Sequence, residues 1–257
     1  MRALNNNLNV GLISRLAFTL AEVLIVLGIV GTIAELTIPT LISDFQDKAA
    51  VVGLKSEASN LQQAISLAVV NEGNIEDWYS GTTPRDATKA VAVMLSKYLK
   101  GQNCDVEATS ICTSSDAYKK FNPSLPTFTF DTTVTYSEIV LLDGSILYFY
   151  VNYNGTDFMD IIFIIDVNGL KGPNRIAYDV FSFTVYSAQF ANANNLKSQV
   201  LIPSGNVSGA ISGSCDSTRS GTGGIGWSCT SWAYFNGNRD YIHCRSVLNW
   251  DTKTTCD

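Results

Sequence analysis

The chain is 257 residues long, 46% apolar and 16% charged, and its formal net charge is −6 at neutral pH. This length allows one globular domain of moderate size and a separate helix. The acidic balance argues against a nucleic-acid-binding surface over the body of the protein, so nucleic acid is not an expected partner.

The N-terminal region is dominated by an apolar run from Phe18 to Pro39, preceded by residues 1–17, which hold arginine but no acid. At ~1.5 Å per residue, a helix over this run is about 30 Å long, which matches the hydrocarbon core of a bilayer. The run contains Glu22 near its start and Glu35 near its end. A charge at mid-membrane costs at least ~2.5–3.5 kcal/mol unless it is paired, so Glu22 requires a partner.

The segment from Ala17 to Ile29 resembles the class III leader of type IV pilins and type II secretion pseudopilins. The family pattern is a small residue, a cleavage point, Phe-Thr-Leu-x-Glu and an apolar helix, and here the segment is AFTLAEVLIVLGI. The resemblance implies that a prepilin peptidase removes residues 1–17 by cutting between Ala17 and Phe18, and then methylates the new amine of Phe18. Ala17 departs from the glycine usual in the family, which predicts slower cleavage or a variant peptidase. The alternative is a plain signal anchor with an incidental glutamate.

The same resemblance implies a partner for Glu22, namely the amine of Phe18 in a neighbouring subunit of a fibre. Such a pair relieves two buried charges together. The implied partners are the peptidase, other pilin or pseudopilin subunits, an inner-membrane assembly platform and the membrane itself, and no cofactor is required. The implied location is the bacterial inner membrane, as a single-pass protein, before assembly, and a periplasmic or cell-surface filament afterwards.

An amphipathic stretch follows Pro39 and continues the helix. Its apolar residues recur at steps of three and four, which places them on one helical face. They are Val51, Leu54, Ala58, Leu61, Ile65 and Ala68, and the opposite positions, predicted to face water, hold Lys55, Glu57, Asn60 and Gln63. Gly73 is suited to end the helix. We therefore expect a spine helix over residues 18–72 with a transmembrane half over 18–39.

The next segments alternate between helix, loop and strand signals. Ala87–Lys100 predicts a short helix, and residues 101–126 are polar and predict a loop. From Phe128 the chain is rich in β-branched and aromatic residues, which predicts strands. The expected strands lie near residues 133–142, 145–152, 158–166 and 180–187. Asp-Gly and Asn-Gly pairs at the turns predict antiparallel neighbours.

Ile161–Ile165 is apolar without alternation, which suits a central strand covered on both faces, one of them by the long helix. The predicted fold class is therefore α+β. The resemblance to pilins implies a pilin-like fold, in which the long N-terminal helix packs on an antiparallel sheet. We expect a globular α+β head over residues 73–202 and a cysteine-rich C-terminal lobe over residues 203–257.

A second resemblance lies at residues 166–174 and 179–181, which are similar to a D-x-N-G-x-K-G-P-N…D-x-F signature in a group of pseudopilin-like proteins. Asp166, Asn168 and Asp179 offer the hard oxygen ligands that Ca²⁺ accepts, and some pseudopilins bind calcium in this region of the fold. Calcium is therefore one hypothesis for this segment. The alternative, which we favour, is a turn whose Asp and Asn side chains bond their own backbone.

Six cysteines without a C-x-x-C pair indicate disulfides formed in an oxidising compartment. Proximity in sequence favours Cys104–Cys112, Cys215–Cys229 and Cys244–Cys256, and other connectivities stay open. Aromatic residues crowd the C-terminal lobe. They are interpreted as its own core for the most part, and alternatively as a surface that binds a glycan, another surface or a secreted substrate.

Catalytic motifs are weak in this chain. Residues 221–226 match G-x-G-x-x-G in a Gly-Ser-rich stretch without strand–helix context, and neither a P-loop nor a nucleophile elbow is present. His243 is the only histidine, and we interpret it as a structural residue instead of a member of a catalytic triad. The resemblance to pilins and pseudopilins implies a structural subunit of such a filament, and an enzyme is not expected. The alternatives are a minor pilin that acts as a tip adhesin or substrate-binding module through its C-terminal lobe, and a membrane-anchored periplasmic enzyme.

Overall fold

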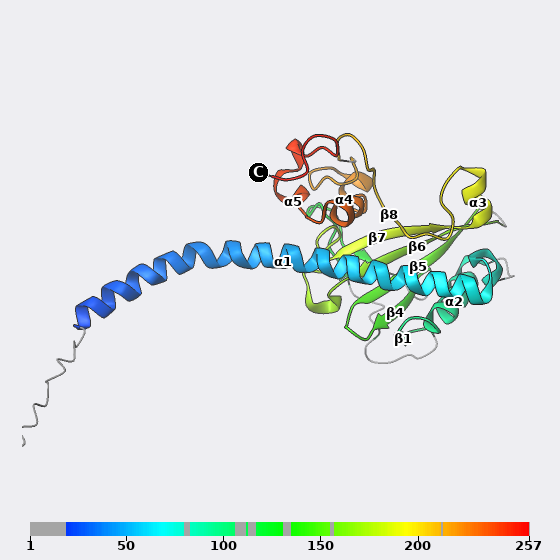
Figure 1. Cartoon of the computed structure of the whole chain (residues 1–257), viewed down its shortest axis with the longest axis horizontal. Coiled ribbons are helices and arrows are strands. Elements are labelled where there is room, and N and C mark those ends of the chain that lie inside the picture. The colour runs from blue at the N-terminus through cyan, green and yellow to red at the C-terminus, as the bar shows by residue number, and fades with distance from the viewer. Residues whose placement is uncertain are drawn as a thin grey trace, which may run out of the picture. The chain divides into compact units, whose positions relative to one another are not determined.

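The computed structural model describes residues 19–79, 83–105, 112, 117–130, 135–154, 157–211 and 213–256. Contacts between residues divide the chain into two compact units, one up to Phe45 and the other from Gln46 onward. Helix α1 (Leu20–Glu72) belongs to both units (Figure 1). It ends where Gly73 adopts a φ of +89° and donates its N–H to the carbonyl of Val69, so the predicted helix end is confirmed.

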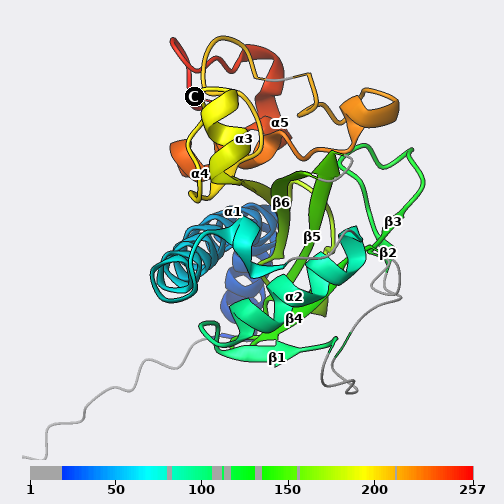
Figure 2. The ribbon, with the colours of Figure 1, turned by 90° about the vertical axis from the view of Figure 1, so that its right-hand side faces the viewer.

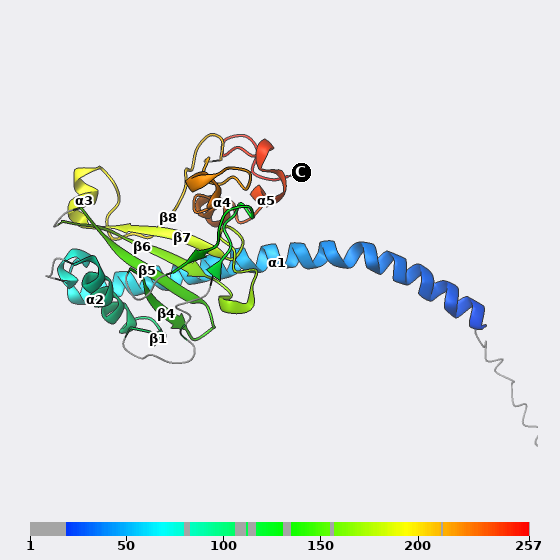
Figure 3. The ribbon, with the colours of Figure 1, turned by 180° about the vertical axis from the view of Figure 1, so that it is seen from behind.

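The second unit is built on a six-stranded sheet in the order β1-β4-β5-β6-β7-β8, in which all neighbours are antiparallel. Figure 3 shows β4 to β7 side by side. The strands are β1 (Gly101–Asn103), β4 (Ser137–Leu141), β5 (Ile146–Asn154), β6 (Asp157–Asp166), β7 (Val180–Tyr186) and β8 (Ile202–Pro203). The four long strands and their antiparallel pairing were predicted from β-branched and aromatic composition and from turn residues, and both are confirmed.

The prediction of a loop over residues 101–126 was wrong in part. Strand β1 lies there, and β2 (Ala117–Tyr118) pairs with β3 (Phe128–Thr129) in a separate two-stranded sheet. Strands of two or three residues are too short to show a periodic pattern, so only their tertiary pairing defines them.

Helix α2 (Pro84–Ser96) lies beside the second half of α1 on the same side of the sheet (Figure 2). It begins and ends earlier than the predicted Ala87–Lys100. The reason is local, because Thr83 accepts a hydrogen bond from the Asp86 N–H as an N-cap and proline fits the first helical turn.

The face of the sheet beneath α1 and α2 carries the main core. Along β6, Ile161, Phe163 and Ile165 join Leu54 and Leu61 of α1 in this cluster. Ile164 points to the other face, where it packs in a second cluster with Tyr118, Phe130 and Tyr148. Because both faces of β6 are covered, the prediction of a central strand from its continuous apolar run is confirmed.

The C-terminal residues add short helices, namely α3 (Ala188–Ala193), α4 (Cys229–Asn236) and α5 (Tyr241–Cys244). The 3₁₀ turns are η1 (Ile75–Trp78), η2 (Gly169–Lys171), η3 (Gly221–Gly224) and η4 (Arg245–Val247). Trp232 and Tyr241 are buried in the same core as α1 and the sheet. The fold is therefore α+β, with a long N-terminal helix on an antiparallel sheet.

Candidate functional site

The first part of α1 presents an apolar surface. Its exposed apolar side chains run from Leu20 to Phe45 and include Leu24, Leu27 and Leu36. An 18-residue window of α1 has a mean hydropathy of 2.0 and no buried residue. By length and composition, α1 is able to cross a membrane.

Thr19 and Glu22 form a reciprocal cap at the start of α1. The N–H of Glu22 donates to Thr19 Oγ1 over 3.2 Å, and the N–H of Thr19 donates to Glu22 Oε2 over 2.8 Å. This is the capping box, and Thr-x-x-Glu is its sequence signal. This cap was not predicted, because Glu22 was interpreted only as the partner of a neighbouring subunit. Ala17 and Phe18 lie outside the described residues, so their cleavage and methylation stay predictions.

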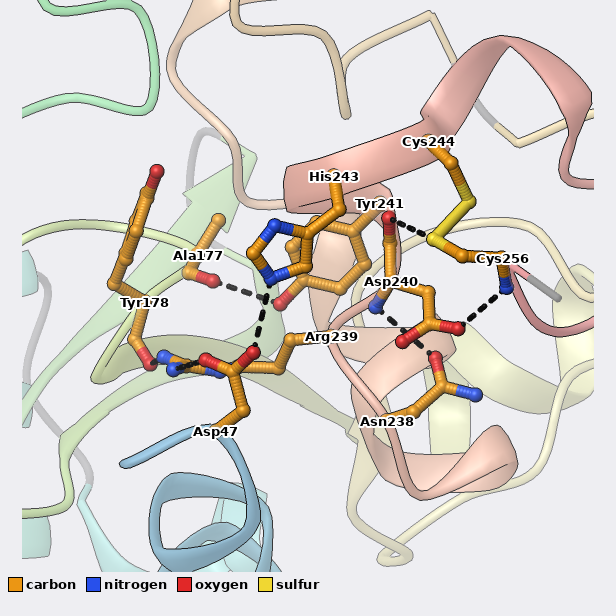
Figure 4. A network of polar contacts seen from close by, with 10 residues as sticks. All are labelled: Asp47, Ala177, Tyr178, Asn238, Arg239, Asp240, Tyr241, His243, Cys244 and Cys256. Carbon is orange, nitrogen blue, oxygen red and sulfur yellow. Dashed lines mark hydrogen bonds and ion pairs between the residues drawn. A yellow bond between two sulfur atoms is a disulfide. The ribbon is translucent and has the colours of Figure 1, made fainter. Parts of the chain in front are cut away.

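The second candidate feature is a carboxylate on α1 that holds the C-terminal segment. Asp47 accepts a hydrogen bond from Nη2 of Arg239, and its Oδ2 lies 3.1 Å from Nε2 of His243 (Figure 4). Arg239 is only 5% exposed, and its Nη1 donates to the carbonyl oxygen of Tyr178. Its guanidinium also lies 5.6 Å from the centre of the Tyr178 ring. Arg239 therefore joins α1, the β6–β7 connection and the C-terminal segment.

Further bonds extend this network. The Tyr241 hydroxyl donates to the carbonyl of Ala177 over 2.7 Å, and the Cys256 N–H donates to Asp240 Oδ2 over 2.7 Å. The half-exposed His243 is part of this network through its contact with Asp47. No local pattern in the sequence indicates that Asp47 and Arg239 meet.

The predicted calcium ligands lie together in the β6–β7 connection, but their oxygens bond the turn itself. Asp179 accepts the N–H groups of Asn174 and Arg175 over 2.8 and 2.7 Å. Asp166 accepts the hydroxyl of Tyr118 over 3.0 Å and the N–H of Asn168 over 3.3 Å. Two carboxylates bonded in this way leave few oxygens for an ion that takes 6–8 ligands.

The third predicted calcium ligand is Asn168. Its Nδ2 donates to the carbonyl of Gly172 over 2.8 Å, and its Oδ1 is buried with no hydrogen-bond partner among the described residues. Within the described residues, no group of three His, Cys, Asp or Glu side chains is placed to hold a metal. Burial and the neighbouring Asp179 raise the pKa of Asp166 to about 8. The arrangement of the side chains of Asp166, Asn168 and Asp179 therefore fits a stabilised turn better than a calcium site.

The prediction that Glu57 faces water was wrong. Glu57 is buried, because Asp143 in the β4–β5 turn covers it. The two residues line a cavity of about 540 Å³. Burial, and then Asp143, raise the pKa of Glu57 to about 7. Although burial opposes it, hydrogen bonds from Ser145 lower the pKa of Asp143, so Glu57 is the member of the pair that holds the proton.

The structure contains the disulfides Cys104–Cys112, Cys215–Cys229 and Cys244–Cys256, with Sγ–Sγ distances of 2.11, 2.03 and 2.17 Å. Each bond joins cysteines that are neighbours along the chain, the pairing that proximity favours. Two of the bonds lie in the C-terminal part, where Cys215 and Cys229 are part of the core. These bonds restrict the unfolded chain and so stabilise a segment with few long regular elements.

In comparisons with known proteins, no family model, no curated protein and no solved structure matches this chain.

Proposed function

We propose that this chain is a pilin-type structural subunit of an envelope-spanning filament, of the type IV pilus or type II secretion kind. It assembles through its N-terminal helix after a prepilin peptidase removes the leader. The observation that carries the proposal is α1 itself. Its first part exposes apolar side chains of membrane-spanning length, while its later part is an element of the core of the second unit.

This helix supports a simple assembly mechanism. In the bilayer, lipid covers the apolar side chains between Leu20 and Phe45. In a filament the helices of neighbouring subunits cover them instead, and Gly28 and Gly31 allow close approach because they carry no side chain. Exposure of this surface to water costs about 25 cal/mol per Å², so a subunit that leaves the bundle is disfavoured.

The proposed pilin fold gives Glu22 two tasks. The capping box holds its carboxylate against the N–H of Thr19, the second residue after the proposed cleavage point. In the proposed bundle, the same carboxylate pairs with the amine of Phe18 in a neighbouring subunit. Pairing these groups removes two uncompensated charges from the apolar spine.

The chain is not proposed to be an enzyme. Its only histidine is His243, which is occupied in the contact with Asp47 that holds the C-terminal segment. The proposal therefore rests on assembly, with the bacterial inner membrane as the site of the precursor and the filament as the site of the mature subunit.

Mass spectrometry of the mature N-terminus tests this function. The full chain is expressed in a host with a prepilin peptidase and assembly machinery, and the expected species begins with N-methyl-Phe18. A retained Met1, or a mature protein cut at another site, would overturn the proposal.

Two variants of the cleavage site sharpen this experiment. Ala17→Gly restores the residue usual at the cut in the resembled family and should be processed at least as fast as the wild type. Ala17→Leu places a bulky side chain at the cut and should accumulate as precursor. Equal processing of both variants would show that this bond is not the one recognised.

A further inference from the structure

A cavity of about 380 Å³ lies on the sheet face that is turned away from α1. Its floor follows the strand register, because Tyr150, Ile162 and Thr184 stand opposite one another on β5, β6 and β7. Ile164 and Ser182 form the next row along the same strands. The wall comes from the C-terminal segment and includes Trp227. The size lies within the range of about 300–1,000 Å³ typical of small-molecule pockets.

The chemistry of the lining is unusual for an acidic protein. Among its described residues are six serines and threonines, three aromatic residues and three isoleucines, and none of them is charged. An anionic ligand would therefore meet no counter-charge in this lining, which is costly in a partly apolar site. The described lining favours a neutral ligand over an anion.

Contacts with neighbouring rings hold the aromatic side chains of the cavity in place. The rings of Tyr136 and Tyr150 meet edge to face at a centroid distance of 5.0 Å and an interplanar angle of 80°. Trp227 is held in the same way against Phe128, at 6.2 Å and 86°. Because each ring is fixed by a neighbour, their apolar surfaces present a constant outline to a ligand. Burial also raises the pKa of Tyr136 and of Tyr150, so both phenols remain neutral.

The hydroxyl groups are positioned by the fold. Ser182 Oγ lies 3.0 Å from Ser204 Oγ, and the Ser182 N–H donates to Thr230 Oγ1 over 2.9 Å. The Ser204 N–H donates to the carbonyl of Ser182 over 2.9 Å. A hydroxyl both donates and accepts, so a row of fixed hydroxyls matches a ligand that carries several hydroxyls of its own.

We propose that this cavity binds a neutral saccharide unit, with its C–H face on the aromatic side chains and its hydroxyls on the serine and threonine row. An apolar peptide side chain would offer these hydroxyls no polar group in exchange for the water that it displaces, which is unfavourable. A saccharide satisfies both halves of the lining. This inference does not depend on filament assembly, because the cavity is formed by the sheet and the C-terminal segment alone.

The test uses the full chain in detergent and a panel of neutral oligosaccharides built from glucose, galactose or N-acetylglucosamine. Binding is measured by saturation-transfer NMR and by titration calorimetry. At least one member should bind, and acidic sugars of the same size should bind at least about tenfold more weakly. Absence of binding across the neutral panel, or equal binding of the acidic sugars, overturns the proposal.

Three variants locate the site. Trp227→Ala removes an aromatic wall, and Thr184→Val removes a floor hydroxyl while keeping the shape, so the second variant remains informative if the first does not fold. Each should weaken saccharide binding about tenfold. Phe235→Ala removes an exposed aromatic residue outside the cavity and should leave binding unchanged. Undiminished binding by Thr184→Val, or equal loss in Phe235→Ala, overturns the assignment.

Filament incorporation is scored separately on the same variants. A chain that binds saccharide and forms no filament contradicts the proposed function alone. A chain that forms filaments and ignores the neutral panel contradicts the saccharide site alone.

Discussion

Arg239 and Asp47 form an ion pair across 192 residues of sequence, and it joins the C-terminal segment to the spine helix. The guanidinium is almost completely buried, while the carboxylate is 23% exposed. A buried pair contributes little compared with apolar residues of the same volume, but removal of one partner leaves an uncompensated charge. The connection is therefore a structural clamp whose halves cannot be changed singly without a large cost.

The first prediction concerns this clamp. Asp47→Asn should lower the free energy of unfolding by about 3–5 kcal/mol, because it leaves the Arg239 charge buried without a counter-charge. Chemical denaturation of the full chain in detergent, followed by tryptophan fluorescence, measures the change. Lys97→Ala breaks an exposed pair with Glu72 and serves as the control, because an exposed pair contributes little to stability. Equal effects of the two substitutions would contradict the clamp.

The second prediction concerns Glu57. Its folded pKa of about 7 lies above the ordinary value of 4.5. The stabilisation it provides is therefore complete below the ordinary pKa and is lost as the pH rises through about 7. Glu57→Gln keeps the shape of the protonated form, so it should raise the Tm at pH 8 by roughly 2–6 °C and change it little at pH 5.

Thermal unfolding of wild type and Glu57→Gln between pH 5 and pH 8 checks this sign. Glu72 is the matched control on the same helix, because hydrogen bonds from Lys97 and then Tyr98 lower its pKa. Glu72→Gln should therefore give no stabilisation at pH 8. A Glu57→Gln protein that loses stability at pH 8 would show that the buried carboxyl is ionised without cost.

The third prediction separates the two roles of Glu22. Glu22→Gln keeps an oxygen for the Thr19 N–H but removes the charge, so peptidase processing should continue while filament incorporation falls. Thr19→Ala removes the hydroxyl that accepts the Glu22 N–H, costs about 0.5–2 kcal/mol at the helix start and should leave incorporation intact. Immunoblotting of sheared filaments measures incorporation. Normal incorporation of Glu22→Gln would refute the charge pair.

The fourth prediction addresses calcium. Because Asp179 and Asp166 bond the turn itself, the Tm should not change between a calcium buffer and a chelator. Asn168→Ala should destabilise the chain by about 1 kcal/mol in both conditions, since it removes the bond to the Gly172 carbonyl. A calcium-dependent gain near ~2.7 kcal/mol at a hundredfold excess over Kd would instead establish a cation site.

Local sequence patterns predicted many of the helices and strands correctly. The spacing of Leu54, Ala58 and Leu61 predicted the buried face of α1, and the continuous run at Ile161–Ile165 predicted a strand covered on both sides. These features depend on periods of a few residues, which a single sequence displays directly. The short strands β1 and β2 have no such period and were missed.

The contacts of the candidate site residues were harder to predict from the sequence than the helices and strands. Glu57 was predicted to face water from its position on the helix, but burial depends on the β4–β5 turn, which lies far away in sequence. The capping box at Thr19 and Glu22 has a local signal in the sequence, Thr-x-x-Glu. It was not predicted because the Glu22 carboxylate was assigned instead to the Phe18 amine of a neighbouring subunit. Both cases show that a side chain's partner is harder to predict than its secondary structure.

By itself, the sequence determined the elements whose causes are local. They are an apolar helix long enough to span a membrane, antiparallel strands joined at Asp-Gly and Asn-Gly turns, and cysteines close enough in sequence to pair with their neighbours. Only the tertiary structure decided that Asp47 meets Arg239, that Glu57 is buried and that Tyr150, Ile162 and Thr184 form the floor of a cavity. The physical reason is that such contacts arise from strand register and helix packing between distant segments. These arrangements are set by the burial of the whole core, which no short stretch of the chain specifies.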